Sequence, residues 1–254
     1  MKGNSVQPRV MKIQLFGADA GELRTEIGKH PSFTLVEENP DVIICYGGDG
    51  TLLSAERTWP GVPKAPIRNS RRGNRCMAHP HAEVIARLAA GTLARTEYLK
   101  IACAVRHTDR AVPAFRLIAM NEINVHMGRI NSAVRFLLWL DDEPFHNGQE
   151  ILGDGLVVST PFGSTAYFCH ITRGVFHAGI GVAFQNTAEH VNHVVVPENV
   201  RVRVVITRGP ATLAYDNSSE YFPIREGHEL VLCKHAEPAV ILTWQPMTHP
   251  SDEF

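Results

Sequence analysis

The loop at residues 47–51, GGDGT, combines three glycines with one carboxylate directly after a short apolar run. Glycines leave backbone N–H groups uncovered, so such a loop can approach a phosphate closely. A helix that begins there adds partial positive charge, and we expect Thr51 to cap it. Asp49 is suited to accept a proton from a hydroxyl or to hold Mg²⁺. A plain strand-to-helix turn also explains an Asp-Gly pair, so the loop alone leaves both interpretations open.

A second polar segment occupies residues 153–167 and reads GDGLVVSTPFGSTAY. An apolar strand leads there into a Pro/Gly elbow, where side-chain and backbone donors can meet a polar ligand. The elbow holds four small hydroxyls, those of Ser159, Thr160, Ser164 and Thr165. Tyr167 follows and can stack on a flat ring or form a hydrogen bond. The alternative interpretation is a capped helix start with ordinary Ser/Thr usage.

A third signal is the polar pair Asn121-Glu122, which we expect inside one strand over residues 117–126. Burying such groups without partners costs a few kcal/mol, so the pair favours a site. An amide beside a carboxylate suits a purine edge or a ribose diol. The alternative is that one of the two faces solvent, as strand alternation allows.

The elements that must position these motifs change character along the chain. Up to residue 95, strand-like and helix-like stretches alternate, which predicts an α/β domain with a parallel sheet. Its expected strands are residues 10–16, 33–36 and 41–46, and its expected helices are residues 19–29, 51–59 and 80–93.

From residue 96 to residue 254 we expect a β-rich domain. Its strand-like stretches are rich in Val, Ile, Leu and Phe. They cover residues 96–107, 114–126, 133–140, 152–160, 193–207, 212–215, 230–234 and 239–244. A cleft between the two domains is the default binding site.

Composition excludes several classes of function. The 25 Lys and Arg residues nearly balance the 26 Asp and Glu residues, which argues against a nucleic-acid binder. No apolar run approaches the roughly 18 residues that span a bilayer, so we expect no membrane partner. Five scattered cysteines predict reduced thiols in a cytoplasmic protein. No residue pattern predicts a metal held by the protein itself.

Together the three motifs resemble the NAD kinase family, whose pattern joins G-G-D-G-[TN], an N-E pair and D-G-x-[IV]-x-S-T-P-T-G-S-T-A-Y. This chain has GGDGT at 47–51, NE at 121–122 and DGLVVSTPFGSTAY at 154–167, with only Phe162 departing from the last motif. The resemblance implies the NAD kinase/diacylglycerol kinase-like fold, an α/β domain joined to a β-rich one with the dinucleotide between them. Related lipid kinases share the GGDGT loop, whereas the elbow is similar to that of NAD kinases.

The resemblance implies an enzyme that phosphorylates NAD at the adenosine-ribose 2′-hydroxyl to give NADP. ATP or inorganic polyphosphate would be the donor, with Mg²⁺ or another divalent cation. Asp49 matches the family's general base, and the phosphate loop is matched by Gly47, Gly48, Gly50 and Thr51. The NAD-binding positions matched are Asn121, Glu122, Asp154, Ser164, Thr165, Ala166, Tyr167, His170 and Asp216. A homo-oligomer, a dimer or a tetramer, is implied as well.

Departures from the family pattern keep other functions open. A glycine-rich loop of the family is replaced at residues 66–76 by a segment with four arginines, Arg68, Arg71, Arg72 and Arg75. They would contact phosphate by bidentate hydrogen bonds or form a solvated basic loop. His170 stands where the family has a hydroxyl, and Asp216 precedes Asn-Ser where the family has Gly-Gln. One alternative is a kinase of the same superfamily acting on another hydroxyl, and a second is a non-catalytic dinucleotide-binding regulator.

Overall fold

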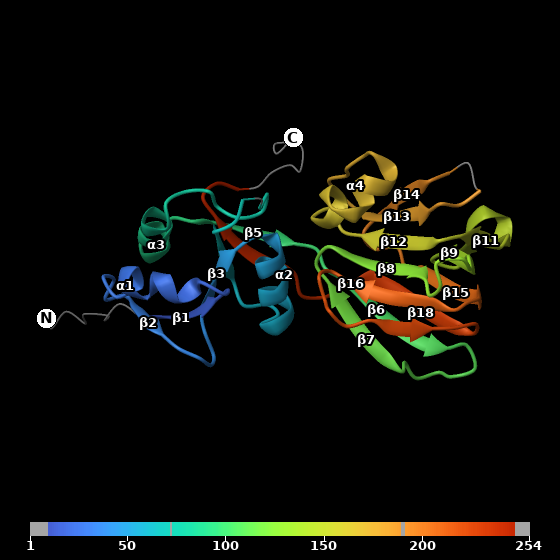
Figure 1. Cartoon of the computed structure of the whole chain (residues 1–254), viewed down its shortest axis with the longest axis horizontal. Helices are drawn as coiled ribbons and strands as arrows, with labels where there is room; N and C mark the ends of the chain where they lie inside the picture. The colour runs from blue at the N-terminus through green and yellow to red at the C-terminus, as the bar shows by residue number, and fades with distance from the viewer. Residues whose placement is uncertain (1–9, 72, 189–190, 247–254) are drawn as a thin grey trace, which may run out of the picture. The chain divides into compact units, whose positions relative to one another are not determined.

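The chain folds into two units, which we describe separately. The computed structural model describes residues 10–71, 73–188 and 191–246 (Figure 1). The first unit runs to Glu97 and includes the chain again from Ala239, and the second unit runs from Tyr98 to Pro238. The last described strand therefore belongs to the first unit, whereas the expected division at residue 95 assigns it to the β-rich domain.

The first unit is an α/β structure built on a six-stranded sheet in the order β2-β1-β3-β4-β19-β5. β1 is parallel to β2 and β3, and β4 is parallel to β3 and β19. This confirms the expected parallel sheet. The strands are β1 (Met11–Phe16), β2 (Phe33–Leu35), β3 (Val42–Gly47), β4 (Lys64–Arg68), β5 (Ala94–Tyr98) and β19 (Ala239–Thr243).

Helices pack on this sheet through their apolar residues. The helices are η1 (Ala20–Leu23), α1 (Arg24–Ile27), α2 (Asp49–Thr58) and α3 (His81–Ala89). Ile27 of α1 and Leu88 of α3 share a core with Ile13 and Ile44 of the sheet, while α2 contacts β3 and β4. The first four residues of β3 are buried, as expected for a strand covered on both faces.

The second unit consists of two antiparallel sheets around one core, which confirms the β-rich expectation. Val105, Phe136 and Val204 of the seven-stranded sheet share that core with Leu156 and Val182 of the six-stranded sheet. The larger sheet has the order β10-β9-β15-β18-β6-β7, with β11 paired to β9, and the smaller has the order β14-β13-β12-β8-β16-β17.

The strands of the larger sheet are β6 (Ile101–His107), β7 (Phe115–Ala119), β9 (Val134–Leu140), β10 (Glu143–Pro144), β11 (Ile151–Gly153), β15 (Val202–Arg208) and β18 (His228–Lys234). The smaller sheet holds β8 (Glu122–Met127), β12 (Gly155–Ser159), β13 (Ile180–Gln185), β14 (His193–Val196), β16 (Ala211–Tyr215) and β17 (Phe222–Ile224). The short helices are η2 (Phe145–Gly148), η3 (Gly163–Thr165) and α4 (Tyr167–Thr172).

Two local expectations are wrong. The pair Asn121-Glu122 does not lie inside one strand, because β7 ends at Ala119 in one sheet and β8 begins at Glu122 in the other. Thr51 does not cap α2. The helix begins at Asp49 with Gly48 as its N-cap, so Thr51 lies in the first turn and donates its backbone N–H to the Gly48 carbonyl at 2.9 Å.

Candidate active site

Asp49 stands where β3 ends and α2 begins, and its carboxylate is held by a later segment of the same unit. Oδ1 accepts the backbone N–H of Arg75 at 2.9 Å, and Oδ2 accepts that of Asn74 at 3.0 Å. The Cys76 thiol lies 3.6 Å from Oδ1. A carboxylate held on both oxygens has a fixed orientation, and a first-turn acid is favoured by the helix dipole.

Gly47 allows the strand and the helix to meet closely. A Cβ at this position would lie 2.2 Å from Thr51 Oγ1, so any side chain would displace the first turn of α2. The Gly47 carbonyl accepts the backbone N–H of Asn69 at 2.9 Å, which ties the end of β4 to the same loop. Sequence and packing thus agree that this turn requires glycine.

The arginines of the neighbouring segment do not form one group. Arg68 and Arg71 are exposed, whereas Arg75 is buried. Arg72 lies outside the described residues. Phosphate contact therefore stays a prediction for Arg68 and Arg71. The Arg75 side chain is buried and does not face solvent as theirs do.

In the second unit, Asp216 holds the backbone of the Asn121-Glu122 pair. Its Oδ1 accepts the N–H of Asn121 at 2.7 Å and that of Glu122 at 3.2 Å, and its Oδ2 accepts the N–H of Met120 at 2.9 Å. The Glu122 carbonyl accepts the Asp216 N–H in return, at 3.0 Å. Asp216 thus positions the pair through hydrogen bonds with its backbone N–H groups.

Both side chains of the pair present buried acceptors. Asn121 Oδ1 and Glu122 Oε2 have no hydrogen-bond partner among the described residues. Burial raises the pKa of Glu122 to about 8, and the nearby charge of Asp216 adds to the effect. Unpaired buried acceptors are costly, so a ligand with hydroxyl or amine groups would supply the missing donors.

In the elbow that follows β12, the side-chain hydroxyls form hydrogen bonds with backbone carbonyls. Thr160 Oγ1 donates to the Met120 carbonyl at 2.6 Å and Ser159 Oγ to the Asn121 carbonyl at 3.3 Å. Ser164 Oγ contacts the carbonyls of Pro161 and Phe176 at 2.8 and 3.1 Å. All three side chains are buried. The expectation that these hydroxyls face a ligand is therefore wrong for Ser159 and Thr160, and Ser164 has the same buried geometry.

Gly163 brings the elbow directly against the polar pair. A Cβ on Gly163 would lie 2.2 Å from the Asn121 carbonyl oxygen, so only glycine permits this approach. The neighbouring Phe162, which departs from the family pattern, is buried and meets the Tyr98 ring edge-on with centroids 4.9 Å apart. Its side chain fills space and offers no hydroxyl.

The remaining elbow residues lie at the end of η3 and in the first part of α4. Tyr167 is 38% exposed, and Thr165 and Ala166 are half-buried. The exposed His170 places its ring Nδ1 2.8 Å from the Ala166 carbonyl. Tyr167 is therefore free to meet a flat ring, while His170 is oriented by the elbow.

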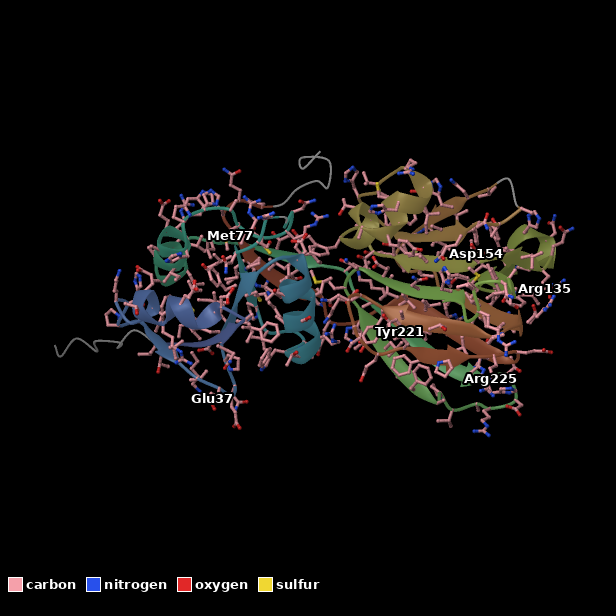
Figure 2. The ribbon with its side chains drawn as sticks, viewed as in Figure 1. Glu37, Met77, Arg135, Asp154, Tyr221 and Arg225 are labelled. Carbon is pink, nitrogen blue, oxygen red and sulfur yellow. The ribbon has the colours of Figure 1, made fainter. Side chains whose placement is uncertain are left out.

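Asp154, labelled in Figure 2, lies between β11 and β12 and accepts the Asn186 amide at 3.2 Å. Nearby, Gln185 Nε2 donates to Asn124 Oδ1 at 2.8 Å, and the buried Gln185 Oε1 has no partner within the described part of the chain. Sequence reasoning missed Asn124, Gln185 and Asn186. For Asn124 a signal was available, since polar residues occupy alternate positions of β8, beginning with Glu122 and Asn124.

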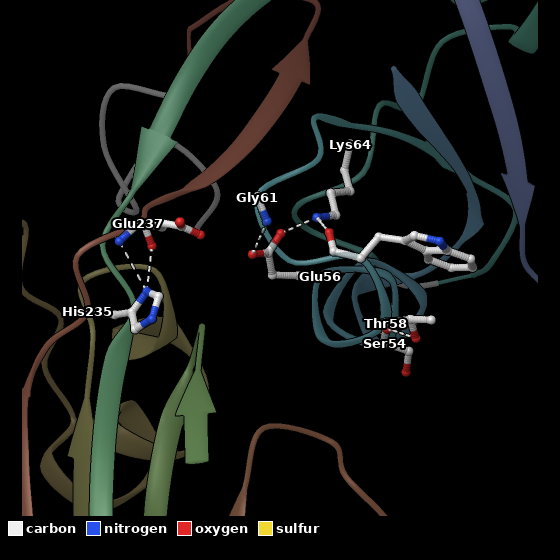
Figure 3. A network of polar contacts seen from close by, with 8 residues as sticks. Ser54, Glu56, Thr58, Gly61, Lys64, His235 and Glu237 are labelled. Atoms are coloured by element: carbon white, nitrogen blue, oxygen red, sulfur yellow. Dashed lines mark hydrogen bonds and ion pairs between the residues drawn. The ribbon is translucent and has the colours of Figure 1, made fainter. Parts of the chain in front are cut away.

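Sequence reasoning also missed a buried ion pair next to α2. Lys64 of β4 pairs with Glu56 of α2 and donates to the Trp59 carbonyl, and Glu56 accepts the Gly61 N–H at 3.3 Å (Figure 3). Both charged side chains are almost fully buried. The pair joins the helix that begins at Asp49 to the strand that leads into the Arg68–Arg75 segment.

Relatives with assigned names match most of this chain. The family described as ATP-NAD kinase C-terminal domain matches residues 120–243. An NAD kinase of Koribacter versatilis is 29% identical over 214 residues, which are 80% of this chain and 73% of that protein. An NAD kinase of Streptococcus pneumoniae is 28% identical over 230 residues, 84% of this chain and 82% of that protein. Over these residues the chain is similar to NAD kinases.

Two solved structures share the fold of this chain. A yeast NADH kinase complexed with NADH has a TM-score of 0.81 at 14% identity and covers 95% of this chain and 86% of that one. An NAD kinase from Archaeoglobus fulgidus in complex with ATP has a TM-score of 0.73 at 19% identity, with 92% and 94% covered. The expected fold is thereby confirmed. The assignment as an enzyme is confirmed by the matching family model and by the NAD kinase relatives.

The expected site residues fall into two sets. Asp49 and the glycine loop belong to the first unit, and the expected NAD-binding residues all belong to the second. No group of three or more His, Cys, Asp or Glu that would hold a metal occurs among the described residues. Nor does any described helix have the length and apolar character to cross a membrane.

Proposed function

We propose that this chain phosphorylates NAD at the 2′-hydroxyl of its adenosine ribose and so forms NADP, with ATP or inorganic polyphosphate as the donor. The observation that carries the proposal is the Asp49 carboxylate at the start of α2, held on both oxygens by backbone N–H groups. The named relatives are NAD kinases, and one neighbour in fold was solved with ATP.

Asp49 is proposed as the general base. Each carboxylate oxygen that accepts one N–H bond keeps a further lone pair, to which a substrate hydroxyl can donate. The 2′-hydroxyl proton passes to Asp49 as the oxygen attacks the terminal phosphorus, and the bond from that phosphorus to the bridging oxygen breaks. The shortened donor departs with that oxygen. Positioning and charge stabilisation supply most of the rate in such transfers.

The second unit is proposed to hold NAD. The buried acceptors of Asn121 and Glu122 suit ribose hydroxyls, and the exposed Tyr167 ring suits a base. Asp154, Thr165, Ala166 and His170 are proposed as further contacts. Asp216 and Ser164 are proposed to position these groups, since their polar atoms are engaged with backbone atoms.

Mg²⁺ is proposed to arrive with the donor. Such ions are usually held by one or two carboxylates together with substrate phosphates and water, so a full protein cage is not required. Asp49 is the carboxylate of the phosphate loop and is proposed for this role. When bound, the ion offsets the negative charge of the polyphosphate. A cytoplasmic location and a homo-oligomeric state stay predictions.

One assay tests the proposal. Purified protein is incubated with NAD, Mg²⁺ and either ATP or polyphosphate, and NADP is measured with an NADP-specific dehydrogenase. We expect NADP from the wild type and a loss of roughly 10²–10⁴-fold in Asp49→Asn. Asp142→Asn is the matched control because Asp142 is 97% exposed. Folded wild-type protein that yields no NADP with either donor would overturn the proposal.

A further inference from the structure

The Cys76 thiol is a third donor to the carboxylate of Asp49. Its sulfur lies 3.6 Å from Oδ1, the oxygen that also accepts the backbone N–H of Arg75 at 2.9 Å. The other oxygen, Oδ2, accepts the N–H of Asn74 at 3.0 Å. All three donors come from consecutive residues at the end of the segment 66–76, where the chain departs from the family pattern. A side chain of that segment therefore reaches the proposed base directly.

The Cys76 thiol keeps its proton and so acts as the donor. The side chain is buried, and burial raises the pKa of the thiol, an effect to which the nearby charge of Asp49 adds. An ionised carboxylate offers acceptors only, so the S–H group donates and Oδ1 accepts. A thiol is a weak donor to neutral groups, but an ionised acceptor strengthens a hydrogen bond.

The position of the thiol is fixed by the sheet. Met77, the next residue and labelled in Figure 2, pairs with Ile67 of β4. Its N–H donates to the Pro66 carbonyl and its carbonyl accepts the Arg68 N–H, both at 2.9 Å. The Met77 side chain is buried in the core of the first unit. The segment that carries the three donors is thus anchored before any ligand binds, and donors held in this way need no reorganisation during a reaction.

These contacts distinguish the two oxygens of the Asp49 carboxylate. An ionised carboxylate has about four lone-pair sites, two on each oxygen. On Oδ1, one site receives the Arg75 N–H and the other receives the Cys76 S–H. On Oδ2, one site receives the Asn74 N–H. With these three donors from the described residues in place, the acceptor site that remains for a ligand belongs to Oδ2.

We propose that Cys76 is a positioning residue, whose thiol occupies Oδ1 of Asp49 and leaves Oδ2 as the oxygen that receives the substrate proton. The inference rests on the proposed function and names the atom that acts in it. The proton of the acceptor hydroxyl passes to Oδ2 as the hydroxyl oxygen forms a bond to the terminal phosphorus. The bond from that phosphorus to the bridging oxygen breaks, and the shortened donor leaves with that oxygen. Without the thiol, the hydroxyl can also bind to Oδ1, in an orientation that does not lead to transfer.

A mutant cycle in the full chain tests whether the thiol acts through Asp49. Cys76→Ala should lower kcat about fivefold and change the KM values for NAD and for the donor by less than about twofold, because orientation is lost and binding contacts are kept. Cys76→Ser keeps a donor and should retain about half of the wild-type kcat or more. In the Asp49→Asn background, Cys76→Ala should lower the residual rate by less than about twofold. Cys45→Ala is the matched control and should keep the wild-type kcat, since Cys45 is another buried free thiol of the first unit.

Infrared absorption by the S–H stretch tests the contact without the reaction. The band that disappears in Cys76→Ala belongs to this thiol, and it should move to higher frequency in Asp49→Asn because the acceptor loses its charge. A band that does not move would overturn the contact. An unchanged kcat in folded Cys76→Ala, or an equal fall in both backgrounds, would overturn the role of Cys76 and leave the proposed function intact. Folded wild-type protein that yields no NADP with either donor would overturn the proposed function and the proton step at Oδ2, and the infrared band would still decide the contact.

Discussion

The carboxylate of Asp216 lies 2.7 Å from the backbone nitrogen of Asn121, although 95 residues separate the two in the chain. The chain passes from one sheet to the other between Ala119 and Glu122, so the N–H groups at the crossing need acceptors outside a continuous strand. Asp216 accepts three of them. A turn after β16 therefore sets the direction of the Asn121-Glu122 pair.

Asp216→Asn should weaken this support without changing the shape of the turn. Asp216 has a φ of 44°, a conformation that asparagine tolerates well, so the variant isolates the lost acceptor and the lost charge. We expect unfolding to become easier by about 1–3 kcal/mol and the KM for NAD to rise severalfold. Urea titration and steady-state kinetics measure the two effects. Asp142→Asn is the exposed control, and equal behaviour of the two variants would contradict the assigned role.

Glu122 should make stability fall as the pH rises. Its pKa is raised from 4.5 to about 8 by burial and by the charge of Asp216. Between these values the folded state keeps a proton that the unfolded state releases, so the free energy of unfolding decreases by up to roughly 1.4 kcal/mol per pH unit. The loss begins near pH 4.5 and ends near pH 8. Urea titrations across this range measure the slope.

Glu122→Gln should remove that slope and should be the more stable protein at pH 8. The exposed Glu143→Gln is the matched control and should keep the wild-type profile. Since hydroxyl donors favour the ionised carboxylate, NAD should also bind wild type more tightly as the pH rises through 8. A slope that survives in Glu122→Gln would assign the titration to another group.

Local pattern predicted the parts of the fold that local chemistry controls. The β-branched run of β3, the glycine turn after it and the start of α2 each follow from preferences of neighbouring residues, so the sequence predicted all three. Four stretches expected as single strands are divided between two strands: residues 96–107, 114–126, 152–160 and 193–207. Within the second unit both sheets face one core, so the apolar pattern continues where the chain changes sheets.

The sequence pattern did not predict which side chains would meet in the folded chain. Asp216 and Asn121 show no mutual signal in the sequence, because strand order decides that they meet. Glu56 and Lys64 are closer in the chain, but their contact depends on how α2 packs against β4. β13 was missed although its last residue, Gln185, is a polar group at the end of an apolar run. The hydroxyls of the elbow were recognised by type, but their direction depends on the main-chain carbonyls around them.

Gly163→Ala should disturb the polar pair through a steric clash. The added Cβ would lie 2.2 Å from the Asn121 carbonyl oxygen, and backbone atoms cannot move aside cheaply. We expect a loss of about 1–3 kcal/mol in unfolding free energy, together with weaker NAD binding. Gly21→Ala is the matched control, since a Cβ there meets nothing within 4 Å. Similar melting temperatures for the two variants would contradict the close approach.

The buried Lys64–Glu56 pair should show strong coupling between its members. Removal of one partner leaves an uncompensated charge in the core, so Lys64→Met and Glu56→Gln should each lower the free energy of unfolding by about 3–5 kcal/mol. The double variant Glu56→Leu with Lys64→Met replaces both charges by apolar groups and should recover much of the loss.

A thermodynamic cycle needs the same substitutions in both contexts, so Glu56→Leu alone and Lys64→Met alone complete it. The exposed pair Arg95–Glu97 is the control, and its cycle should give a coupling of at most about 1 kcal/mol. Because Glu56 belongs to the helix that begins at Asp49, the single variants should also lower kcat more than they raise the KM for NAD. Additive effects at Glu56 and Lys64 would show that the two charges are stabilised independently, through the Gly61 N–H and the Trp59 carbonyl.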